Sequence, residues 1–515
     1  MGSCQKDYFS SIKSLEKLYH TEETLLKHAK DYSIFLKAQI DKFRKFIEVI
    51  QDAHSKADEN PSAFIGNPID SFSLIKRLVE DWRITKSQVE NSNIFEEISS
   101  RIDSIISSEE YPTEDELTGS AEGFSRLRDV YNLDISEMAS GFISGIKMAD
   151  SMSWSDCFYV GKKLYEMGDY NNTQPWIREA LDKFTKNHND DQDSVEILES
   201  FTNITVAIND LDTALNTSER ILKIQPNHKS AKFTKDTIEK LSSIFVRKSN
   251  PGFYVRNSYI SVRDYKHYEA VCRDEITRSP SEIRDLHCKY ESYRVPFLKI
   301  APFKLEIINF DPLILMFHGV LYNSETLLLK ARSLPTIGRS KVGIVKSEIS
   351  NERTSHSSYV NIRDEPSLKN FVQRIEDMTQ LNIDDFNSVQ VANYGIGGHY
   401  APHHDHFGKS DSYPQYHLGD RISTSMFYAS EVDLGGSTAF PLLKVNVKPV
   451  KGSLLFWYNL YSSGEQDNRA MHAGCPVTKG SKWIFNVWLR FKPQFQKRKC
   501  DIEDDSWKSI RNTKH

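Results

Sequence analysis

Apolar residues near the start of the chain recur at alternating intervals of three and four positions. Counted from Ile12, ten of twelve such positions are apolar or aromatic, and charged residues lie between them. The positions are Ile12, Leu15, Tyr19, Glu22, Leu26, Ala29, Ser33, Leu36, Ile40, Phe43, Ile47 and Ile50. This heptad pattern predicts a long helix in a coiled coil, and self-association is the favoured interpretation. An amphipathic helix packed against its own domain is the alternative that the pattern leaves open.

Further helical periodicity follows this first segment. Residues 63–82 (AFIGNPIDSFSLIKRLVEDW) predict a helix that helps to complete an all-α amino-terminal domain over 1–145. Segments 156–184 and 205–231 each pair two amphipathic helices across a turn, GDY in the first and NDLD in the second. This scheme is typical of tetratricopeptide units and predicts a peptide-binding domain over 146–245. Plain helical packing is the alternative.

The pattern changes in the second half of the chain. Residues 246–261 contain proline and glycine without a sustained period, which indicates a linker, extended here to 246–300. After it come short alternating runs separated by glycine-rich turns: SVQVANYG, RISTSMFY, KVNVKPV, GSLLFWYNL and KWIFNVWLRF. Residues 301–515 are therefore expected to form an antiparallel β barrel or jelly roll. The predicted fold class is multidomain α+β.

The charge balance restricts the kind of partner. The chain has 66 lysines and arginines against 71 aspartates and glutamates, a formal net charge of −5 in 515 residues. This balance does not indicate a nucleic-acid or anionic-membrane surface. The apolar stretch 312–322 (PLILMFHGVLY) is too short to span a bilayer, so we expect a soluble chain.

Cysteines and glycosylation sequons favour a particular compartment. Cys272 and Cys288 lie 16 residues apart and Cys475 and Cys500 lie 25 apart, which makes two disulfides plausible. Three sequons fall within 46 residues, at Asn171, Asn203 and Asn216. Each tripeptide is common by chance, but together with two disulfides they favour an oxidising, secretory-pathway location.

The segment HYAPHHDHF, residues 399–407, holds four histidines and one aspartate. His403 and Asp405 are separated by one residue, so an extended backbone directs both side chains to the same side. A third ligand is available as His472, just ahead of the final predicted strand. Two imidazoles and one carboxylate are typical of non-haem Fe(II) oxygenases, and zinc in a hydrolase is the alternative. The remaining histidines are expected to face solvent or to line the entrance: His399, His404 and His406.

Lys482 decides between iron and zinc in this interpretation. It lies ten residues after His472, in the aromatic-rich strand KWIFNVWLRF. A lysine ammonium inside such a barrel is costly unless an anion meets it there. A dicarboxylate cosubstrate would supply the anion, which favours an Fe(II) oxygenase.

Five segments carry a resemblance to a known family. They are HTEETLL, VANYGIGGHYAPHHDHF, GGSTAFP, GSLLFWYNLYSSGEQD and HAGCPVTKGSKW. In this order they resemble the α-subunit of animal collagen prolyl 4-hydroxylase, and the resemblance covers almost the whole chain. It implies amino-terminal dimerisation helices, a tetratricopeptide-like domain that binds peptide substrate, and a double-stranded β-helix catalytic domain.

The resemblance also implies roles for individual residues. Fe(II) would be bound by His403, Asp405 and His472, and Lys482 would pair with the distal carboxylate of 2-oxoglutarate. Cosubstrate contacts would also come from Tyr394 and Thr438. Peptide contacts near the target proline would come from Tyr400, Arg421 and Trp488. The two intrachain disulfides of the family would join Cys272 to Cys288 and Cys475 to Cys500.

The activity that the resemblance implies is hydroxylation of C4 of peptidyl proline with O2 and 2-oxoglutarate, which yields succinate and CO2. Ascorbate is implied as the reductant that rescues iron after unproductive turnover. Protein disulfide isomerase is implied as the β-subunit of an α2β2 tetramer in the endoplasmic reticulum lumen. The chain ends in RNTKH rather than a KDEL-like signal, so retention would depend on that partner.

Two departures from the family pattern affect the expected activity. Arg490 stands eighteen residues after His472, where the family usually has a histidine close to the cosubstrate, and arginine keeps its charge permanently. In the tetratricopeptide groove, residues other than the usual tyrosines occupy three positions: Ser200, Asn203 and Val206. These departures keep open a peptide-binding or assembly subunit with little or no turnover. An oxygenase acting on lysine is disfavoured by the tetratricopeptide region and the residues implied to contact proline.

Overall fold

A computed structural model describes residues 11–57, 100–101, 103–104, 107, 114–187, 191–192, 194–244, 262–293, 295–343, 348–362, 365–384, 387–407 and 418–498. The chain divides into two compact units. One is Lys13–Pro112, and the other is Thr113–His515 together with Met1–Ile12. No helix in these described ranges is long and apolar enough to cross a membrane.

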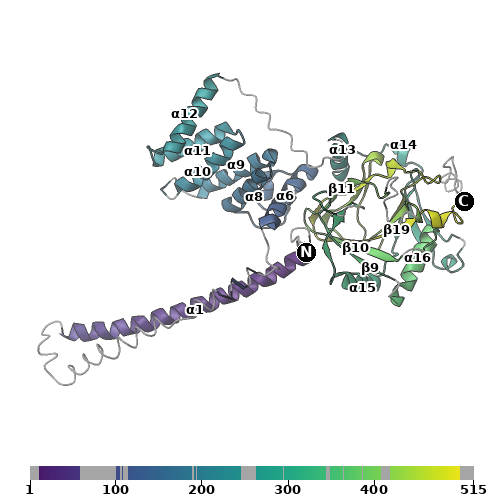
Figure 1. The fold of residues 1–515 in the computed structure, drawn as a ribbon, viewed down its shortest axis with the longest axis horizontal. Helices are drawn as coiled ribbons and strands as arrows, with labels where there is room; N and C mark the ends of the chain where they lie inside the picture. The colour runs from purple at the N-terminus through teal and green to yellow at the C-terminus, as the bar shows by residue number, and fades with distance from the viewer. Residues whose placement is uncertain are drawn as a thin grey trace. The chain divides into compact units, whose positions relative to one another are not determined.

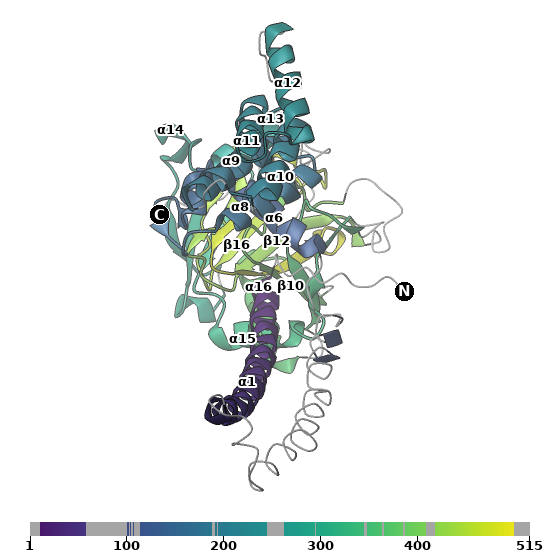
Figure 2. The same cartoon turned by 90° about the vertical axis from the view of Figure 1, so that its left-hand side faces the viewer.

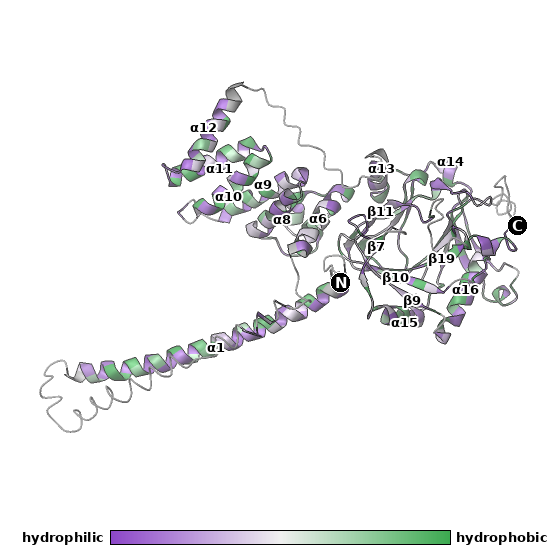
Figure 3. Ribbon diagram, in the orientation of Figure 1, coloured by the Kyte–Doolittle hydropathy of each residue, from purple (hydrophilic) through white to green (hydrophobic). Residues whose placement is uncertain are grey.

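The smaller unit contains one long helix, α1 (Ile12–Ala57), which contains the whole predicted heptad segment (Figure 1). Figure 3 shows apolar and polar residues alternating along it, and apolar side chains such as Leu26, Ile40 and Ile47 are exposed. The prediction of a long amphipathic helix is therefore confirmed, while its pairing with a second chain stays a prediction. The helix predicted over 63–82 lies outside the described residues.

The helical part of the larger unit contains two helix pairs, α8–α9 and α10–α11, with further helices on either side. Its helices are α6 (Glu114–Tyr131), α7 (Ile135–Ala139), α8 (Trp154–Glu166), α9 (Tyr170–Asn187), α10 (Ser194–Ala207), α11 (Leu211–Ile224) and α12 (Lys229–Ile244). Helix α8 packs on α9 and α10 on α11, as the tetratricopeptide pattern predicts. The second pair begins at Ser194, earlier than the predicted segment 205–231. Gly161 permits the first close approach, because a Cβ there would lie 2.7 Å from Ile177 Cδ1. Trp176, Phe184 and Phe201 fill the core between the pairs.

The two largest sheets of the described residues lie in the carboxy-terminal part of the larger unit. Within the described residues, one has nine strands in the order β3-β4-β5-β16-β12-β19-β10-β9-β6, and the other four, β11-β17-β14-β15. The large sheet contains β3 (Cys288–Glu291), β4 (Phe303–Asn309), β5 (Ile314–His318), β6 (Gly338–Arg339), β9 (His356–Asn361), β10 (Ser388–Tyr394), β12 (Arg421–Tyr428), β16 (Leu454–Tyr458) and β19 (Lys482–Arg490). The small sheet contains β11 (Tyr400–His403), β14 (Thr438–Phe440), β15 (Val445–Val447) and β17 (His472–Gly474).

Alternation along the strands gives the large sheet two apolar faces. Phe427 and Phe485 belong to a core packed against α15 (Asn323–Ser333) and α16 (Lys369–Thr379), which lie against this sheet (Figure 1, Figure 2). Their neighbours Met426 and Ile484 point the other way, into a second core shared with the small sheet. This arrangement confirms the predicted jelly roll. The candidate metal ligands and Lys482 lie between its two sheets.

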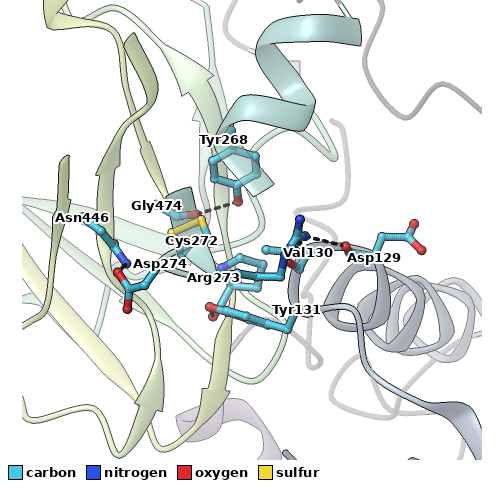
Figure 4. The surroundings of a disulfide bond; sticks show 11 residues. Asp129, Val130, Tyr131, Tyr268, Cys272, Arg273, Asp274, Asn446 and Gly474 are labelled. Carbon is cyan, nitrogen blue, oxygen red and sulfur yellow. Dashed lines mark hydrogen bonds between the residues drawn. A yellow bond between two sulfur atoms is a disulfide. The ribbon is translucent and has the colours of Figure 1, made fainter. Parts of the chain in front are cut away.

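The predicted disulfide pairing is wrong. The structure joins Cys272 to Cys475, with a Cα–Cα distance of 5.8 Å (Figure 4). Helix α13 (Val262–Cys272) packs on β14 and β15, so its last residue meets the end of β17, although 203 residues separate the two cysteines. Cys288 is a free, exposed thiol at the start of β3, and Cys500 lies outside the described residues. Sequence spacing failed because tertiary packing of α13, not proximity along the chain, selects the partner.

Candidate active site

Strands β11 and β17 bring together the three predicted metal ligands. His403 and His472 face each other in the antiparallel register, and Asp405 follows directly after β11. The ligand atoms of the three side chains all lie within 4.8 Å of one another, close enough for one ion. In each histidine, Nδ1–H donates to a carbonyl two residues earlier, Ala401 O at 2.8 Å and Ala470 O at 3.1 Å. These bonds fix both rings with Nε2 toward the centre.

The electrostatics of this cluster suit a divalent cation. Burial lowers the pKa of His403 and of His472, and for His403 the second imidazole adds to the effect. Burial alone would raise the pKa of Asp405, but His472, His403 and Arg421 outweigh it and hold that pKa well below its usual range. Two neutral imidazoles and one carboxylate are therefore available at neutral pH, the ligand set and protonation that Fe(II) requires.

Asp405 is held by residues that the sequence analysis did not identify in this role. Thr424 Oγ1 donates to Asp405 Oδ2 at 2.6 Å, and Trp488 Nε1 donates to the same oxygen at 3.0 Å. Asn459 Nδ2 in turn donates to Thr424 Oγ1 at 2.9 Å. Two donors on Oδ2 leave Oδ1 free to face a metal, and such support of a ligating carboxylate orients it. The sequence signal that could have identified Thr424 is its place as a polar residue facing inward in the strand RISTSMFY.

Changing Thr424 to valine is expected to weaken iron binding about tenfold, because Asp405 loses its shortest hydrogen bond while the side-chain volume is kept. The rate of iron removal by a chelator would measure this. Ser425→Ala removes a buried hydroxyl from the same strand on its opposite face and serves as the control. An unchanged rate in Thr424→Val, or an equal effect in the control, would argue against the role.

A cavity of about 250 Å³ adjoins the metal ligands and contains Lys482. Lys482 is 3% exposed, and its Nζ lies 5.8 Å from the ring centroid of Tyr394 and 5.7 Å from that of Tyr428. Burial lowers the pKa of Lys482 to about 7. No acidic side chain forms an ion pair with Lys482 in the part of the chain that the structure describes. Tyr394 and Thr438 also line the cavity, and their contacts with the cosubstrate stay a prediction.

The residues predicted to contact the peptide line the same cavity. The ring of Tyr400 stacks on that of His403 with centroids 3.5 Å apart, and burial raises the pKa of Tyr400 to about 12. The guanidinium of Arg421 lies 4.1 Å from the ring centroid of Trp488. Aromatic and cationic side chains thus line the cavity beside the metal ligands, and their contacts with the peptide stay a prediction.

Arg490 ends β19 with its guanidinium 4.6 Å from the ring centroid of Phe407, and its effect on the cosubstrate stays a prediction. One predicted position differs from expectation. His399 is 4% exposed, is bonded to Thr354 and is not among the described residues that line the cavity, so it neither faces solvent nor lines the entrance. His404 and His406 do line the cavity, as expected.

The jelly roll, the His-x-Asp and histidine ligands, and the buried lysine define a 2-oxoglutarate-dependent Fe(II) dioxygenase. In agreement, residues 389–490 match the 2OG-Fe(II) oxygenase superfamily. Residues 11–145 match the prolyl 4-hydroxylase alpha-subunit N-terminal region, and residues 154–243 match the prolyl 4-hydroxylase peptide-substrate-binding domain. The chain belongs to the prolyl 4-hydroxylase α-subunit family.

Two relatives of nearly the same length support this assignment. The chain is 33% identical to prolyl 4-hydroxylase subunit alpha-2 of Caenorhabditis elegans, covering 98% of this chain and 95% of the relative. It is 31% identical to subunit alpha-1 of Homo sapiens, covering 96% of both chains. A solved viral collagen prolyl hydroxylase from Paramecium bursaria Chlorella virus-1 is 25% identical and covers 34% of this chain and 94% of its own, with a TM-score of 0.27.

Proposed function

We propose that this α-subunit hydroxylates C4 of peptidyl proline in collagen-like or other proline-rich secreted proteins. One oxygen atom of O2 enters the C–H bond of proline and the other enters succinate, while 2-oxoglutarate loses CO2. The observation that carries the proposal is the convergence of the His403, Asp405 and His472 ligands with the buried ammonium of Lys482 in one cavity.

The residues of the cavity divide the work of the reaction. His403, Asp405 and His472 would hold Fe(II), which when bound supplies the redox centre for O2 and 2-oxoglutarate. Lys482 would bind the distal carboxylate of 2-oxoglutarate, next to Tyr394 and Thr438. Arg490 would bring a permanent positive charge to the position where the family usually has a histidine close to the cosubstrate. The peptide would lie against the rings and cations of Tyr400, Arg421 and Trp488.

Partners and compartment are part of the proposal. The exposed apolar stripe of α1 supports pairing of two α-subunits, and protein disulfide isomerase would complete an α2β2 tetramer. Ascorbate would restore iron after turnover without peptide. The disulfide Cys272–Cys475 supports an oxidising compartment, here the endoplasmic reticulum lumen. The sequon asparagines Asn171, Asn203 and Asn216 are exposed on their helices and would be open to glycans.

The test combines two products. The chain is co-expressed with protein disulfide isomerase and supplied with Fe(II), 2-oxoglutarate, ascorbate and a proline-rich peptide. Peptide-dependent succinate release together with the mass of one added oxygen on proline is the expected result. Succinate without proline oxidation would indicate another substrate. Neither product would favour the alternative, an assembly or peptide-binding subunit without turnover.

The tetratricopeptide groove is expected to bind (Pro-Pro-Gly)n about tenfold more weakly than a tyrosine-lined groove, because it lacks rings that stack on proline. Asn203 and Val206 are exposed on α10 and Ser200 is half-buried, so none of them offers an aromatic face. Calorimetry with the peptide measures the dissociation constant. Asn203→Tyr should tighten binding, while Glu196→Gln on the same helix should not. Tight binding by the unaltered chain would show the prediction to be wrong.

A further inference from the structure

Helix α6 lies between the peptide-binding helices and the oxygenase sheets and contacts both. Although it contains charged residues, it is buried along most of its second half, with Arg126 1% exposed and Glu122 5% exposed. Arg126 Nη2 lies 3.6 Å from Glu122 Oε2, one turn earlier. Burying an ion pair is costly, and the pair contributes little to stability by itself. Stability alone therefore does not account for Arg126 and Glu122 at these positions.

One side of α6 is fixed to the tetratricopeptide helices. Phe124 packs edge-on against Trp176 with ring centroids 5.6 Å apart. Ser125 Oγ donates to Asp169 Oδ2 at 2.5 Å, in the turn between α8 and α9. Arg128 Nη1 donates to Asn172 Oδ1 at 2.7 Å. These contacts fix α6 to α9 and to the turn between α8 and α9, within the tetratricopeptide part.

The other side of α6 is fixed to the oxygenase part. Arg126 Nη1 donates to Gly397 O at 2.9 Å and to Thr354 Oγ1 at 3.4 Å. Tyr131 OH donates to Pro476 O at 2.6 Å, and Arg273 of the loop after α13 donates to Val130 O at 2.8 Å, beside the disulfide in Figure 4. The approach is close, since a Cβ on Gly397 would lie 3.1 Å from Gly123 Cα.

A chain of contacts leads from Thr354, which Arg126 contacts, to the metal ligand His403. Thr354 Oγ1 accepts from His399 N–H at 3.0 Å and lies 2.8 Å from His399 Nδ1, and Thr354 N–H donates to His399 O at 3.0 Å. The next residue is Tyr400, whose ring stacks on His403. A short run of hydrogen bonds and one peptide bond thus joins α6 to the ring that covers a metal ligand.

We propose that Arg126 is a positioning residue for the hydroxylation of peptide. From the middle of α6 it fixes the loop Gly395–His399 and, through Thr354 and His399, the ring of Tyr400 beside His403. The same helix is fixed to the pair α8–α9, and α9 packs on α10, which carries the proposed groove residues. Arg126 would therefore keep the ring of Tyr400, which would contact the target residue, at a fixed position relative to the tetratricopeptide helices that would bind the rest of the peptide. The inference rests on the proposed function.

The test compares three variants in the complete α-subunit with its partner. Arg126→Lys keeps the charge beside Glu122 but cannot reach both Gly397 O and Thr354 Oγ1. Thr354→Val severs the next link with little change in volume. Glu122→Gln removes the buried ion pair but leaves the contacts of Arg126 to Gly397 and Thr354, and it controls for loss of stability alone. Peptide KM, 2-oxoglutarate KM, the ratio of succinate to hydroxyproline, and hydrogen exchange of residues 395–403 are measured.

Arg126→Lys and Thr354→Val are expected to raise the peptide KM about tenfold and to increase succinate released per hydroxyproline. The 2-oxoglutarate KM should stay within about twofold of the value for the unaltered chain, because Lys482 lies on β19 and not on β11, which carries Tyr400. Amides of residues 395–403 should exchange faster in both variants. Glu122→Gln should lower Tm yet keep the product ratio of the unaltered chain.

The proposal is overturned if folded Arg126→Lys and Thr354→Val keep the original peptide KM and product ratio, or if Glu122→Gln alters that ratio equally. If Arg126→Lys does not fold, Thr354→Val alone decides by the same criteria. If the unaltered chain hydroxylates no prolyl peptide, the proposed function fails. The exchange comparison then still tests the tie between α6 and the loop, and unchanged exchange in both variants overturns it.

Discussion

Replacing His403 with alanine is expected to abolish hydroxylation and to strip iron from the chain. His403 supplies one of three side-chain ligands, and its ring is already oriented by the bond from Nδ1 to Ala401 O. Loss of a supporting residue around a metal typically costs 10–100-fold in affinity, and loss of a ligand itself should exceed about 100-fold. Metal content after gel filtration and peptide-dependent succinate release measure the two effects.

His404 provides a matched control for this change. It is the adjacent histidine, but its Nε2 lies 3.2 Å from Asn468 O and it does not belong to the ligand cluster. His404→Ala should therefore retain iron close to the level of the unaltered chain. Full iron retention by His403→Ala, or equal loss in both variants, would mean that the ion is held by other residues.

The sequence predicted the parts of this protein that follow a simple period. The long helix over the heptads of α1, the helix pairs of the tetratricopeptide part and the strands β12 and β19 appear as expected. The one-residue spacing of His403 and Asp405 predicted a shared direction of both side chains, and the antiparallel pairing of β11 with β17 supplies His472 opposite. Spacing along the chain determines the helices, the strands and the shared direction of His403 and Asp405, so a single sequence is enough to predict them.

Features that depend on packing between distant segments were not predictable in this way. Cys272 pairs with Cys475 because α13 lies on the small sheet. His399 is buried because residues 352–355 and α6 cover the loop before β11. Neither spacing nor composition carries information about which loop covers which strand.

Replacing Lys482 with methionine is expected to raise the KM for 2-oxoglutarate roughly a hundredfold, since a buried carboxylate would lose its charged partner. Lys482 lies on the cavity face of β19, opposite Tyr394 in the strand register, where water cannot substitute for the ammonium. Lys479→Met is the control, because that lysine is about half exposed and pairs with Asp433 at the surface. An unchanged KM in Lys482→Met would place the cosubstrate elsewhere.

The pH dependence of binding gives an independent test of the same contact. Burial lowers the pKa of Lys482 to about 7 in the chain without cosubstrate, whereas the unfolded chain keeps the ordinary value of 10.5. Between these values the unfolded chain binds more protons, so this group makes the free energy of unfolding rise with pH across that window. Below pH 7 both states are protonated and the slope from Lys482 vanishes.

A bound carboxylate reverses the preference of Lys482, because it stabilises the ammonium and raises its pKa. Above pH 7, 2-oxoglutarate must therefore bind with uptake of about one proton, and its dissociation constant should rise by up to about tenfold per pH unit. Anaerobic calorimetry at pH 8 in two buffers of different ionisation enthalpy counts that proton. Lys482→Met should bind weakly and without the proton. The same uptake in that variant would assign the titration to another group, and the buried ammonium would then have no part in choosing a dicarboxylate.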